Sequence, residues 1–338
     1  MNLIPNSNGL QRVNMKEKIS TLQWIKRISS AIAIVLLIGF VFQLISNFIG
    51  NEKVSARLNY AKVDGKKMEY RVKGSGDYTI VFDGAIGANL YEWENIAKKV
   101  EKELDVRTFV YNRNGYGFSA SNVTKSPKEK AEELKILLRK AGVSGPLILV
   151  GEEYGSLVMT NFANMYPESV KGMVLIQPFD ESIVKTEEFK KKVRWKYYKS
   201  NLERVGASFG LTSLLEKLNL TITVDGFEEA LPRGADEEFS VHKTKKEYRQ
   251  AISSELESLY KYEDNSQING LMKDKPLYII SKNQDENLKR LGTEEYTNLY
   301  NIDSDSKIIS ITNSDSVFNG ISYVIKEAKR IDRQAKSN

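Results

Sequence analysis

The chain has 338 residues, of which 41% are hydrophobic and 28% charged, so a large buried core is possible and global disorder is excluded. Its net charge of +6 is concentrated at the N-terminus, because residues 1–30 carry +4 of it. The remainder shows no basic face with interleaved aromatic residues, which excludes nucleic-acid binding as the expected function. The absence of cysteine excludes disulfides, thiolate catalysis and cysteine-based zinc sites.

An uncharged segment, AIAIVLLIGFVFQLISNFI, occupies residues 31–49 directly after this basic tail. About 20 apolar residues span a hydrocarbon core, and basic residues such as Lys26 and Arg27 favour the cytoplasmic side. The sequence therefore predicts a cytoplasmic tail (1–30), a single transmembrane signal-anchor (31–49), a stalk (50–56) and an extracellular domain (57–338). A cleaved signal peptide or a buried core helix fits less well, because the apolar segment and the region before it are long.

Short elements follow in alternation. Asp64-Gly65 separates two alternating runs, which indicates a β-hairpin, and Ser126 with Pro127 marks the start of a helix. The segment 182–271 is long, charged and mostly helical. Strands are predicted at 78–84, 106–113, 146–150, 170–176, 276–282 and 307–312, and helices at 91–103, 126–141, 154–166 and 320–333.

Alternating strands and helices predict an α/β fold with a mostly parallel, doubly wound sheet covered on both faces. One stretch within it, LILVGEEYGSLVM (147–159), has the frame of G-x-S-x-G. That motif forms a sharp strand–turn–helix elbow that presents a serine nucleophile. Glu153 occupies the serine position here, although Gly151 and Gly155 are kept. The glycines indicate the elbow geometry and carry no information about activity.

Four motifs in order resemble the α/β-hydrolase superfamily. They are FDGAIGANLYEW (82–93), YNRNGYGFS (111–119), VGEEYGS (150–156) and MYPESVKGMVLIQP (165–178). The first is similar to the family's oxyanion loop, and the second to its D-R-x-G-Y-G-x-S. The chain resembles the capped branch, so a helical cap (about 182–271) is expected between strands six and seven, with one transmembrane helix before the domain.

The resemblance also implies site positions. Glu153 falls at the nucleophile, Asp285 at the acid, and Ser316 at the histidine, while Ala85 and Tyr154 fall at the backbone donors of the oxyanion hole. Nucleophile and base are both replaced, so we interpret the domain as a pseudoenzyme. No cofactor is expected.

The chain has one histidine, His242, in the lysine-rich cap segment SVHKTKKEY. We interpret it as a surface residue, because a general base must reach its nucleophile. Two displaced nucleophiles stay open as alternatives. Glu153 would attack carbon as the elbow aspartate of haloalkane dehalogenases and epoxide hydrolases does, or Ser156 would substitute for the missing serine.

Several carboxylates follow predicted strands and are expected near one cleft, where ligands bind in open α/β sheets: Asp83, Glu152, Glu153, Asp285 and Asp315. Such a cleft would bind a cation or an amine ligand, or its acids would simply be solvated. No metal is assigned. The aromatic segment RWKYYKSNLERV (194–205) would line a groove or touch the membrane, although packing on the main domain is commoner.

The predicted function is a membrane-anchored extracellular protein that binds a small ligand or an envelope protein. The alternative is an active hydrolase that cleaves small esters or amides with a non-standard catalytic set.

Overall fold

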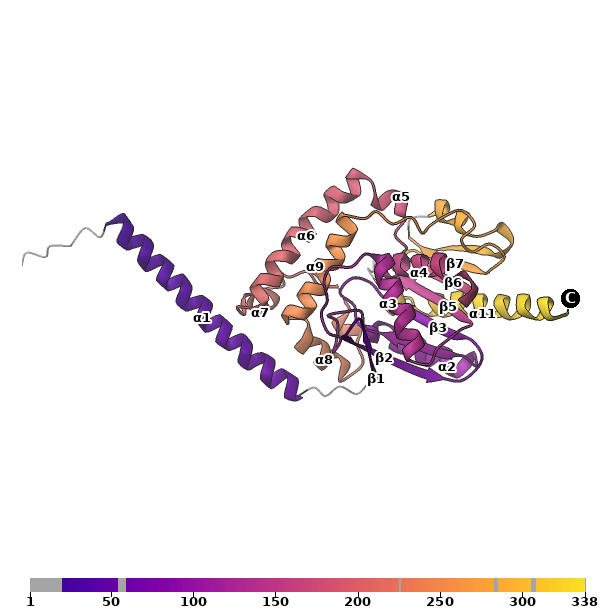
Figure 1. Cartoon of the computed structure of the whole chain (residues 1–338), viewed down its shortest axis with the longest axis horizontal. Coiled ribbons are helices and arrows are strands. Elements are labelled where there is room, and N and C mark those ends of the chain that lie inside the picture. The colour runs from indigo at the N-terminus through magenta and orange to yellow at the C-terminus, as the bar shows by residue number, and fades with distance from the viewer. Residues whose placement is uncertain (1–19, 54–58, 225, 283–284, 305–307, 338) are drawn as a thin grey trace, which may run out of the picture.

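The computed structural model describes residues 20–53, 59–224, 226–282, 285–304 and 308–337. A long N-terminal helix, α1 (Thr21–Lys53), projects from an α/β body (Figure 1). It contains the predicted membrane segment and continues through residues 50–53, where a stalk was expected. The rest of the predicted stalk, and residues 1–19 of the predicted tail, lie outside the described residues.

The body is built on one eight-stranded sheet in the order β1-β2-β4-β3-β5-β6-β7-β8. Pairing is antiparallel from β1 to β4 and parallel from there to β8, which confirms the predicted α/β fold class. The strands are β1 (Asn59–Val63), β2 (Lys66–Gly74), β3 (Thr79–Asp83), β4 (Arg107–Tyr111), β5 (Leu147–Glu152), β6 (Val170–Ile176), β7 (Leu277–Ser281) and β8 (Thr297–Asn301).

The local signals in the sequence explain several of these elements. Val63 pairs with Lys66 across Asp64-Gly65, and both turn residues have positive φ, as a two-residue hairpin requires. The central strands β3 and β5 are buried along their whole length, which is why they read as continuous apolar runs.

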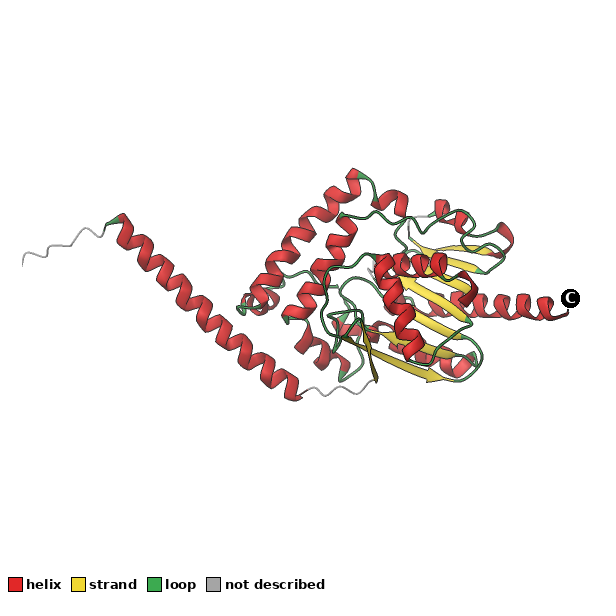
Figure 2. Ribbon diagram, in the orientation of Figure 1, coloured by secondary structure: helices red, strands yellow, loops and turns green. Residues whose placement is uncertain are grey.

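Helices cover both faces of the sheet (Figure 2). One face carries α3 (Pro127–Lys140) and α4 (Tyr154–Met165), and the other carries α2 (Glu94–Glu103) and α11 (Ser314–Ser337), each over its own hydrophobic cluster. The predicted start of α3 is confirmed, because Ser126 forms a capping box with Glu129.

A helical insertion, residues 181–260, lies between β6 and β7; the cap expected there was about 182–271, but residues 261–271 form turns and loop. Its longest helices, α6 and α9, lie side by side, and α9 faces the sheet (Figure 1). The helices of the insertion are α5 (Glu181–Val184), α6 (Glu187–Ala207), α7 (Leu211–Lys217), α8 (Ala235–His242) and α9 (Lys246–Tyr260).

The last predicted strand, at 307–312, was wrong. The eighth strand is β8, a polar edge strand that pairs only with β7, so its sequence lacks an apolar run. The described residues of the apolar stretch form a short helix instead, α10 (Ile309–Thr312), whose Ile309 is buried in the cluster under α2 and α11.

Candidate functional site

The turn between β5 and α4 has the geometry of a nucleophile elbow. The backbone of Glu153 has φ 46° and ψ −109°, a conformation that residues with a Cβ rarely adopt. Three hydrogen bonds hold its backbone: its N–H donates to the Ile176 carbonyl at 3.0 Å, and its carbonyl accepts from the N–H and the hydroxyl of Ser156. The elbow predicted from the two glycines is therefore present with a glutamate at its tip.

Gly155 is required by the way α4 packs on the end of β3. A Cβ there would lie 2.3 Å from the carbonyl oxygen of Asp83, and the Gly155 N–H donates to the Gly84 carbonyl at 3.1 Å. This close approach explains why the glycine is kept without a serine two residues earlier.

Asp83, at the end of β3, is fully buried and has its own partners. The Tyr111 hydroxyl donates to it at 2.8 Å, and Arg113 donates from Nη1. The same guanidinium donates to the carbonyls of Gly84 and Ala85 at 2.8 and 2.9 Å. Arg113 therefore lies beside the oxyanion loop, where the strand ends were expected to form a ligand cleft.

A glutamate from the helical insertion completes this group. Glu255 on α9 accepts from Nε of Arg113 at 2.7 Å and from the Tyr116 hydroxyl at 2.7 Å, and Lys130 lies 3.4 Å away. Burial alone would raise the pKa of Glu255, but attraction to Arg113 and Lys130 lowers it below the usual range. Two acids and two bases are thus buried together with their charges balanced.

A second buried acid pair lies beneath the elbow. The Glu152 carboxylate accepts from the backbone N–H groups of Ile309 and Ser310, at 2.5 and 3.2 Å. Glu92, in the short 3₁₀ helix Leu90–Trp93, accepts from the Ala85 N–H and from the Ser310 hydroxyl, each at 3.2 Å. The two carboxyl groups also hydrogen-bond each other.

The pKa of each carboxyl group in this pair is raised. Burial, the charge of Glu152 and the hydrogen bond to it raise the pKa of Glu92 well above its ordinary value. Burial also raises the pKa of Glu152, but hydrogen-bond donors at Ser310, Glu92 and Ile309 oppose that shift. Both raised pKa values favour a form in which the pair shares one proton between its two carboxyl groups.

The predicted oxyanion positions are only partly available. The N–H of Ala85 is engaged by the buried carboxyl of Glu92. Tyr154 begins α4 as predicted, and its hydroxyl shares a 2.7 Å hydrogen bond with Ser258 on α9. This hydrogen bond joins α9 of the helical insertion to the first residue of α4, directly after the elbow.

Two predicted positions at the C-terminal end are corrected. Ser316 lies inside the first turn of α11, with its N–H bonded to the Asn313 carbonyl, and not in a loop after a strand. The misplaced last strand caused this error. Asp315 points outward, with its side chain 85% exposed and 2.7 Å from Lys99. Residues 302–308, which follow β8 and lie partly outside the described ranges, include no histidine.

Asp285, the residue expected at the acid position, follows β7 and accepts a hydrogen bond from the Ser281 hydroxyl. The predicted carboxylates therefore do not meet in one acidic cleft: Asp83 and Glu152 are buried with separate partners, and Asp315 faces solvent. Among the residues that the structure describes, no group of three or more acidic or histidine side chains could hold a metal ion.

His242 is buried, so its interpretation as a surface residue was wrong. Its ring packs edge-on against Phe118, with 4.5 Å between centroids, and burial together with Lys245 lowers its pKa to about 3. The neighbouring lysines in the sequence predicted that His242 is exposed. The contact with Phe118 that buries it joins residues far apart in the sequence, so no local pattern indicates it. The ring therefore packs between the insertion and the segment that follows β4.

Sequence reasoning missed Arg113, Glu255 and Glu92. Arg113 lies in the motif YNRNGYGFS (111–119), directly after a buried strand. A charged side chain at that position could have been predicted to need a buried partner. Glu255 lies in an ordinary amphipathic helix, and its contact with Arg113 joins positions 142 residues apart.

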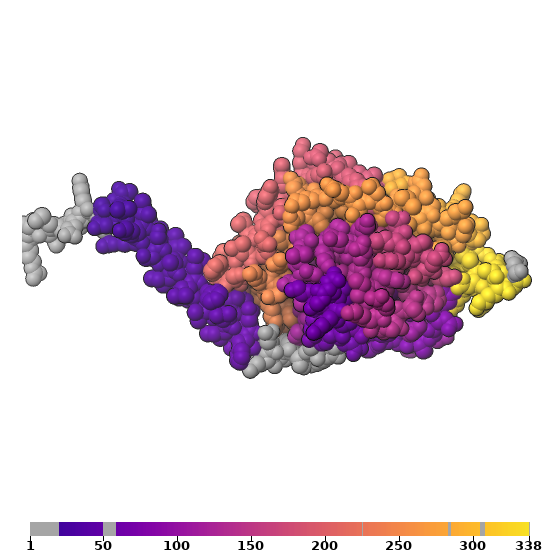
Figure 3. Space-filling model, in the orientation of Figure 1, coloured from indigo at the N-terminus to yellow at the C-terminus, as the bar shows by residue number. Residues whose placement is uncertain are grey.

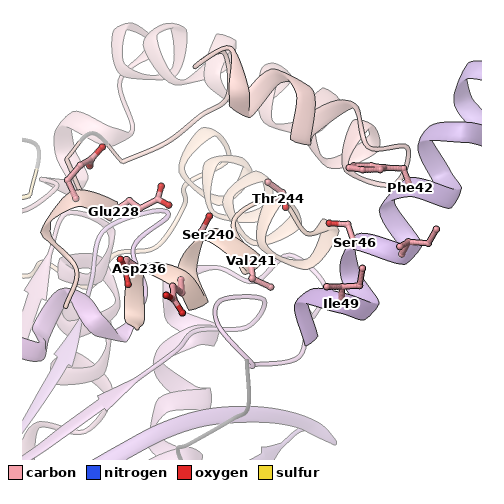
Figure 4. Close-up of a pocket in the computed structure, with 11 residues that line it drawn as sticks. Phe42, Ser46, Ile49, Glu228, Asp236, Ser240, Val241 and Thr244 are labelled. Atoms are coloured by element: carbon pink, nitrogen blue, oxygen red, sulfur yellow. The ribbon is translucent and has the colours of Figure 1, made fainter. Parts of the chain in front are cut away.

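An open cavity of about 1030 Å³ lies away from the elbow, between α1 and α8 (Figure 4). Phe42, Ser46 and Ile49 of α1 form one wall, and acidic residues such as Glu228 and Asp236 form the other.

The sequence matches the alpha/beta hydrolase fold family over residues 78–298, and the chain belongs to that family. Two uncharacterized proteins of Bacillus subtilis (strain 168) are similar. YqjL is 31% identical over 107 residues (31% of this chain, 42% of YqjL), and YbdG is 29% identical over 151 residues (43% of this chain, 46% of YbdG). The chain thus spans less than half the length of these relatives.

Solved structures show the same fold. The Cif epoxide hydrolase from Acinetobacter nosocomialis has a TM-score of 0.65 at 14% identity, over 83% of this chain and 95% of that one. An esterase from Thermogutta terrifontis has a TM-score of 0.59 at 14% identity, over 81% and 98%. The enol-lactonase from Burkholderia xenovorans LB400 has a TM-score of 0.57 at 16% identity, over 79% and 100%.

Proposed function

We propose that this α/β-hydrolase-fold protein is a membrane-anchored, extracellular binding protein that has lost hydrolase chemistry. The observation that carries the proposal is the combination at the elbow. Glu153 holds the nucleophile conformation without a serine, and Glu92 engages the N–H of Ala85 that would stabilise an oxyanion. The carboxyl oxygen at that N–H occupies one of the two backbone donors that a tetrahedral intermediate would need.

The base is missing as well. Acyl transfer in this fold needs a histidine to take the proton of the nucleophile. His242 is the one histidine of the chain, and its contacts are Phe118 and Lys245. The pKa of about 3 also makes it a weak base at neutral pH. Nucleophile, base and one oxyanion donor are therefore all replaced or occupied.

The anchor is α1. An 18-residue window within its segment Thr21–Ile49 has a mean hydropathy of 2.6, and the segment is long and apolar enough to cross a bilayer. Lys26 and Arg27 before the apolar residues favour a cytoplasmic N-terminus, which puts the domain outside. Protease added to intact cells should digest the domain. A soluble mature form starting near residue 50 would instead indicate a cleaved signal peptide.

The helical insertion would act as the cap over the strand ends, with Glu255 and Tyr154 closing the space that a substrate would use. Purified full-length protein should show no turnover of short acyl esters or amides and no labelling by a fluorophosphonate. The E153S variant should also stay inactive, because no histidine activates the new hydroxyl. Turnover by the wild type, or labelling that S156A abolishes, would refute the loss of activity.

A second function is favoured by the conformation of Glu153 itself. In it, Glu153 attacks an epoxide, as the elbow aspartate does in epoxide hydrolases, a class represented among the similar structures. One carboxylate oxygen forms a bond to an epoxide carbon, the ring C–O bond breaks, and the alkoxide takes a proton from water. Without a histidine to activate water, the resulting ester would persist.

Intact-mass spectrometry tests this alternative. Incubation with styrene oxide should leave the mass unchanged if the protein is only a binding protein. A stable one-equivalent adduct on the peptide that contains Glu153, absent in E153Q, would establish the carboxylate nucleophile.

A further inference from the structure

The outer surface of α6 and α7 is an apolar face with no partner among the described residues. It consists of large side chains that are about half exposed or more. We call these residues the α6–α7 face: Trp195, Tyr198, Leu202, Val205, Leu211, Leu214, Leu218 and Leu220.

Helical spacing puts the members on α6 on one side of that helix, while Leu218 and Leu220 follow the end of α7. On α6 they recur at intervals of three and four residues, and Trp195 and Leu202 are each 73% exposed. The opposite side of α6 already has a core: Val193 and Ser200 are buried, and Tyr197 stacks on Tyr260 of α9. The exposed stripe is therefore additional to the packing that folds the insertion.

The face adjoins the helix proposed to cross the membrane. A Cβ on Gly39 of α1 would lie 2.0 Å from the carbonyl oxygen of Phe209, so α1 and the turn before α7 are in close contact. The Ser213 hydroxyl on α7 donates to Oε1 of Gln43 at 3.2 Å, and Gln43 is buried by this contact. Figure 3 shows the atoms of this part of the insertion beside the middle of α1.

The level of this contact along α1 fits the edge of a bilayer. The 29 residues of the apolar helix are about 43 Å long, against roughly 30 Å of hydrocarbon. About 20 residues counted from Ile28, the first after the basic pair, end near Asn47. Gln43 then lies about 6 Å inside the outer edge. Helices that lie in the membrane interface are buried by about 5–10 Å.

The distribution of charge also favours this side of the insertion as the one that faces anionic lipid. Helix α6 has seven basic and three acidic residues. Four basic residues are exposed around the apolar stripe, and we call them the basic flank: Lys191, Lys192, Arg194 and Lys196. The wall of α8 across the cavity in Figure 4 is acidic and would be repelled by anionic lipid. Trp and Tyr beside apolar residues are also the composition of membrane interfaces.

We propose that the α6–α7 face lies in the outer surface of the membrane that α1 crosses, with its apolar side chains among the lipid chains and its basic flank at anionic headgroups. This inference rests on the proposed anchoring. It fixes the orientation of the domain: α6 lies along the bilayer, consistent with its direction across that of α1 in Figure 1, and the insertion separates the membrane from the sheet.

A second copy of the chain is the main competing occupant. Two such faces would bring equal basic flanks together, whereas a bilayer that contains anionic lipid offers opposite charge. The close contact with α1 also keeps the face near the bilayer in every molecule. The membrane is therefore the better fit, and the copy becomes one outcome of the test.

The test uses full-length protein in vesicles of phosphatidylcholine and phosphatidylglycerol. Because the chain has no cysteine, single variants can be labelled with a fluorophore. L202C reports the face, and L37C reports the spanning helix. V123C is the matched control, since Val123 is 71% exposed in a loop of the body. Spin-labelled lipid and aqueous iodide are the two quenchers.

We expect spin-labelled lipid to quench L37C and L202C several-fold more than V123C, and iodide to quench mainly V123C. If L37C is quenched by lipid but L202C behaves like V123C, the face is solvated and only this inference is wrong. If L37C itself is not quenched by lipid, the anchoring fails and the inference with it. Protection of L202C from both quenchers indicates a protein partner and refutes the membrane contact.

The basic flank has its own readout. Replacing Lys191, Lys192 and Arg194 together by glutamine should reduce lipid quenching at L202C in vesicles with phosphatidylglycerol and leave it unchanged in phosphatidylcholine alone. L214C, on α7, repeats the measurement at an independent position. Equal quenching with and without the basic residues would refute their role at headgroups.

Discussion

Nε of Arg113 lies 2.7 Å from Oε1 of Glu255, so a buried ion pair ties the helical insertion to the segment after β4. The guanidinium also binds Asp83 and the carbonyls of Gly84 and Ala85. One side chain therefore links α9, β3 and the loop that would form the oxyanion hole. The space at the carboxyl ends of the strands is therefore occupied by buried charged side chains that hold the fold together.

The first prediction concerns Arg113. R113M should destabilise the protein by about 3–5 kcal/mol, because it leaves Asp83 and Glu255 buried without their shared cation. R330M is the matched control: Arg330 pairs with Glu327 on an exposed part of α11, where loss of an ion pair costs under about 1 kcal/mol. Urea unfolding of the detergent-solubilised protein measures both. Equal midpoints for the two variants would contradict the structural role of Arg113.

The sequence predicted the strands that are buried on both faces of the sheet. β6 was placed at its observed bounds, because a continuous apolar run lies between clear turn signals. β8 was missed because an edge strand such as TNLYN is mostly exposed, and the apolar run after it was mistaken for the strand. The histidine position was shifted to Ser316 by the same error.

The site divides in the same way. The elbow was predictable, since Gly151 and Gly155 report a close approach of backbones. The burial of His242 and the contact of Arg113 with Glu255 depend on segments that meet only after folding, so no local pattern contains them. The raised pKa values of Glu92 and Glu152 likewise arise from two acids 60 positions apart along the chain that are buried side by side.

The second prediction concerns strain at the elbow. Glu153 has φ 46°, which costs a residue with a Cβ about 1–3 kcal/mol, whereas glycine adopts it freely. E153G should therefore be more stable than E153A by about 1 kcal/mol. At Glu132, exposed in the middle of α3, the order should reverse, with glycine less stable than alanine by about 1 kcal/mol. Thermal unfolding of the four variants decides. The same order at both positions would mean that the elbow is unstrained.

The third prediction concerns the proton on Glu92. Its pKa is raised well above the ordinary 4.5, so the folded protein holds a proton that the unfolded chain releases above that value. The free energy of unfolding should therefore fall as pH rises from 4.5 towards the folded pKa. E92Q stays neutral at all these pH values, so its stability relative to the wild type should increase with pH.

Glu94 provides the control for this titration. Burial alone would raise its pKa, but hydrogen bonds from Lys98 and Arg71 lower it. Its contribution is present above the unfolded pKa and is lost as pH falls through the folded value. E94Q should therefore be destabilising at neutral pH and approach the wild type in acid, opposite to E92Q. Urea midpoints across the pH range give both curves, and parallel curves would exclude a protonated Glu92.

The last prediction concerns the contact between α1 and α7. Gly39 allows the carbonyl of Phe209 to approach, so G39L should push the helices apart by steric overlap. In membranes, a short bifunctional thiol reagent should link Q43C to S213C within one chain, because their native side chains are 3.2 Å apart.

G39L should abolish that link, whereas L37C paired with S213C should not react, because Leu37 is exposed on another side of α1. Mass spectrometry of tryptic peptides identifies intramolecular products and separates them from links between copies. If the link between Q43C and S213C persists in G39L, the close approach at Gly39 does not hold the helices together. If that link never forms in the glycine-containing chain, α1 leaves the domain in the membrane, and the position of α7 near the outer edge of the bilayer loses its main support.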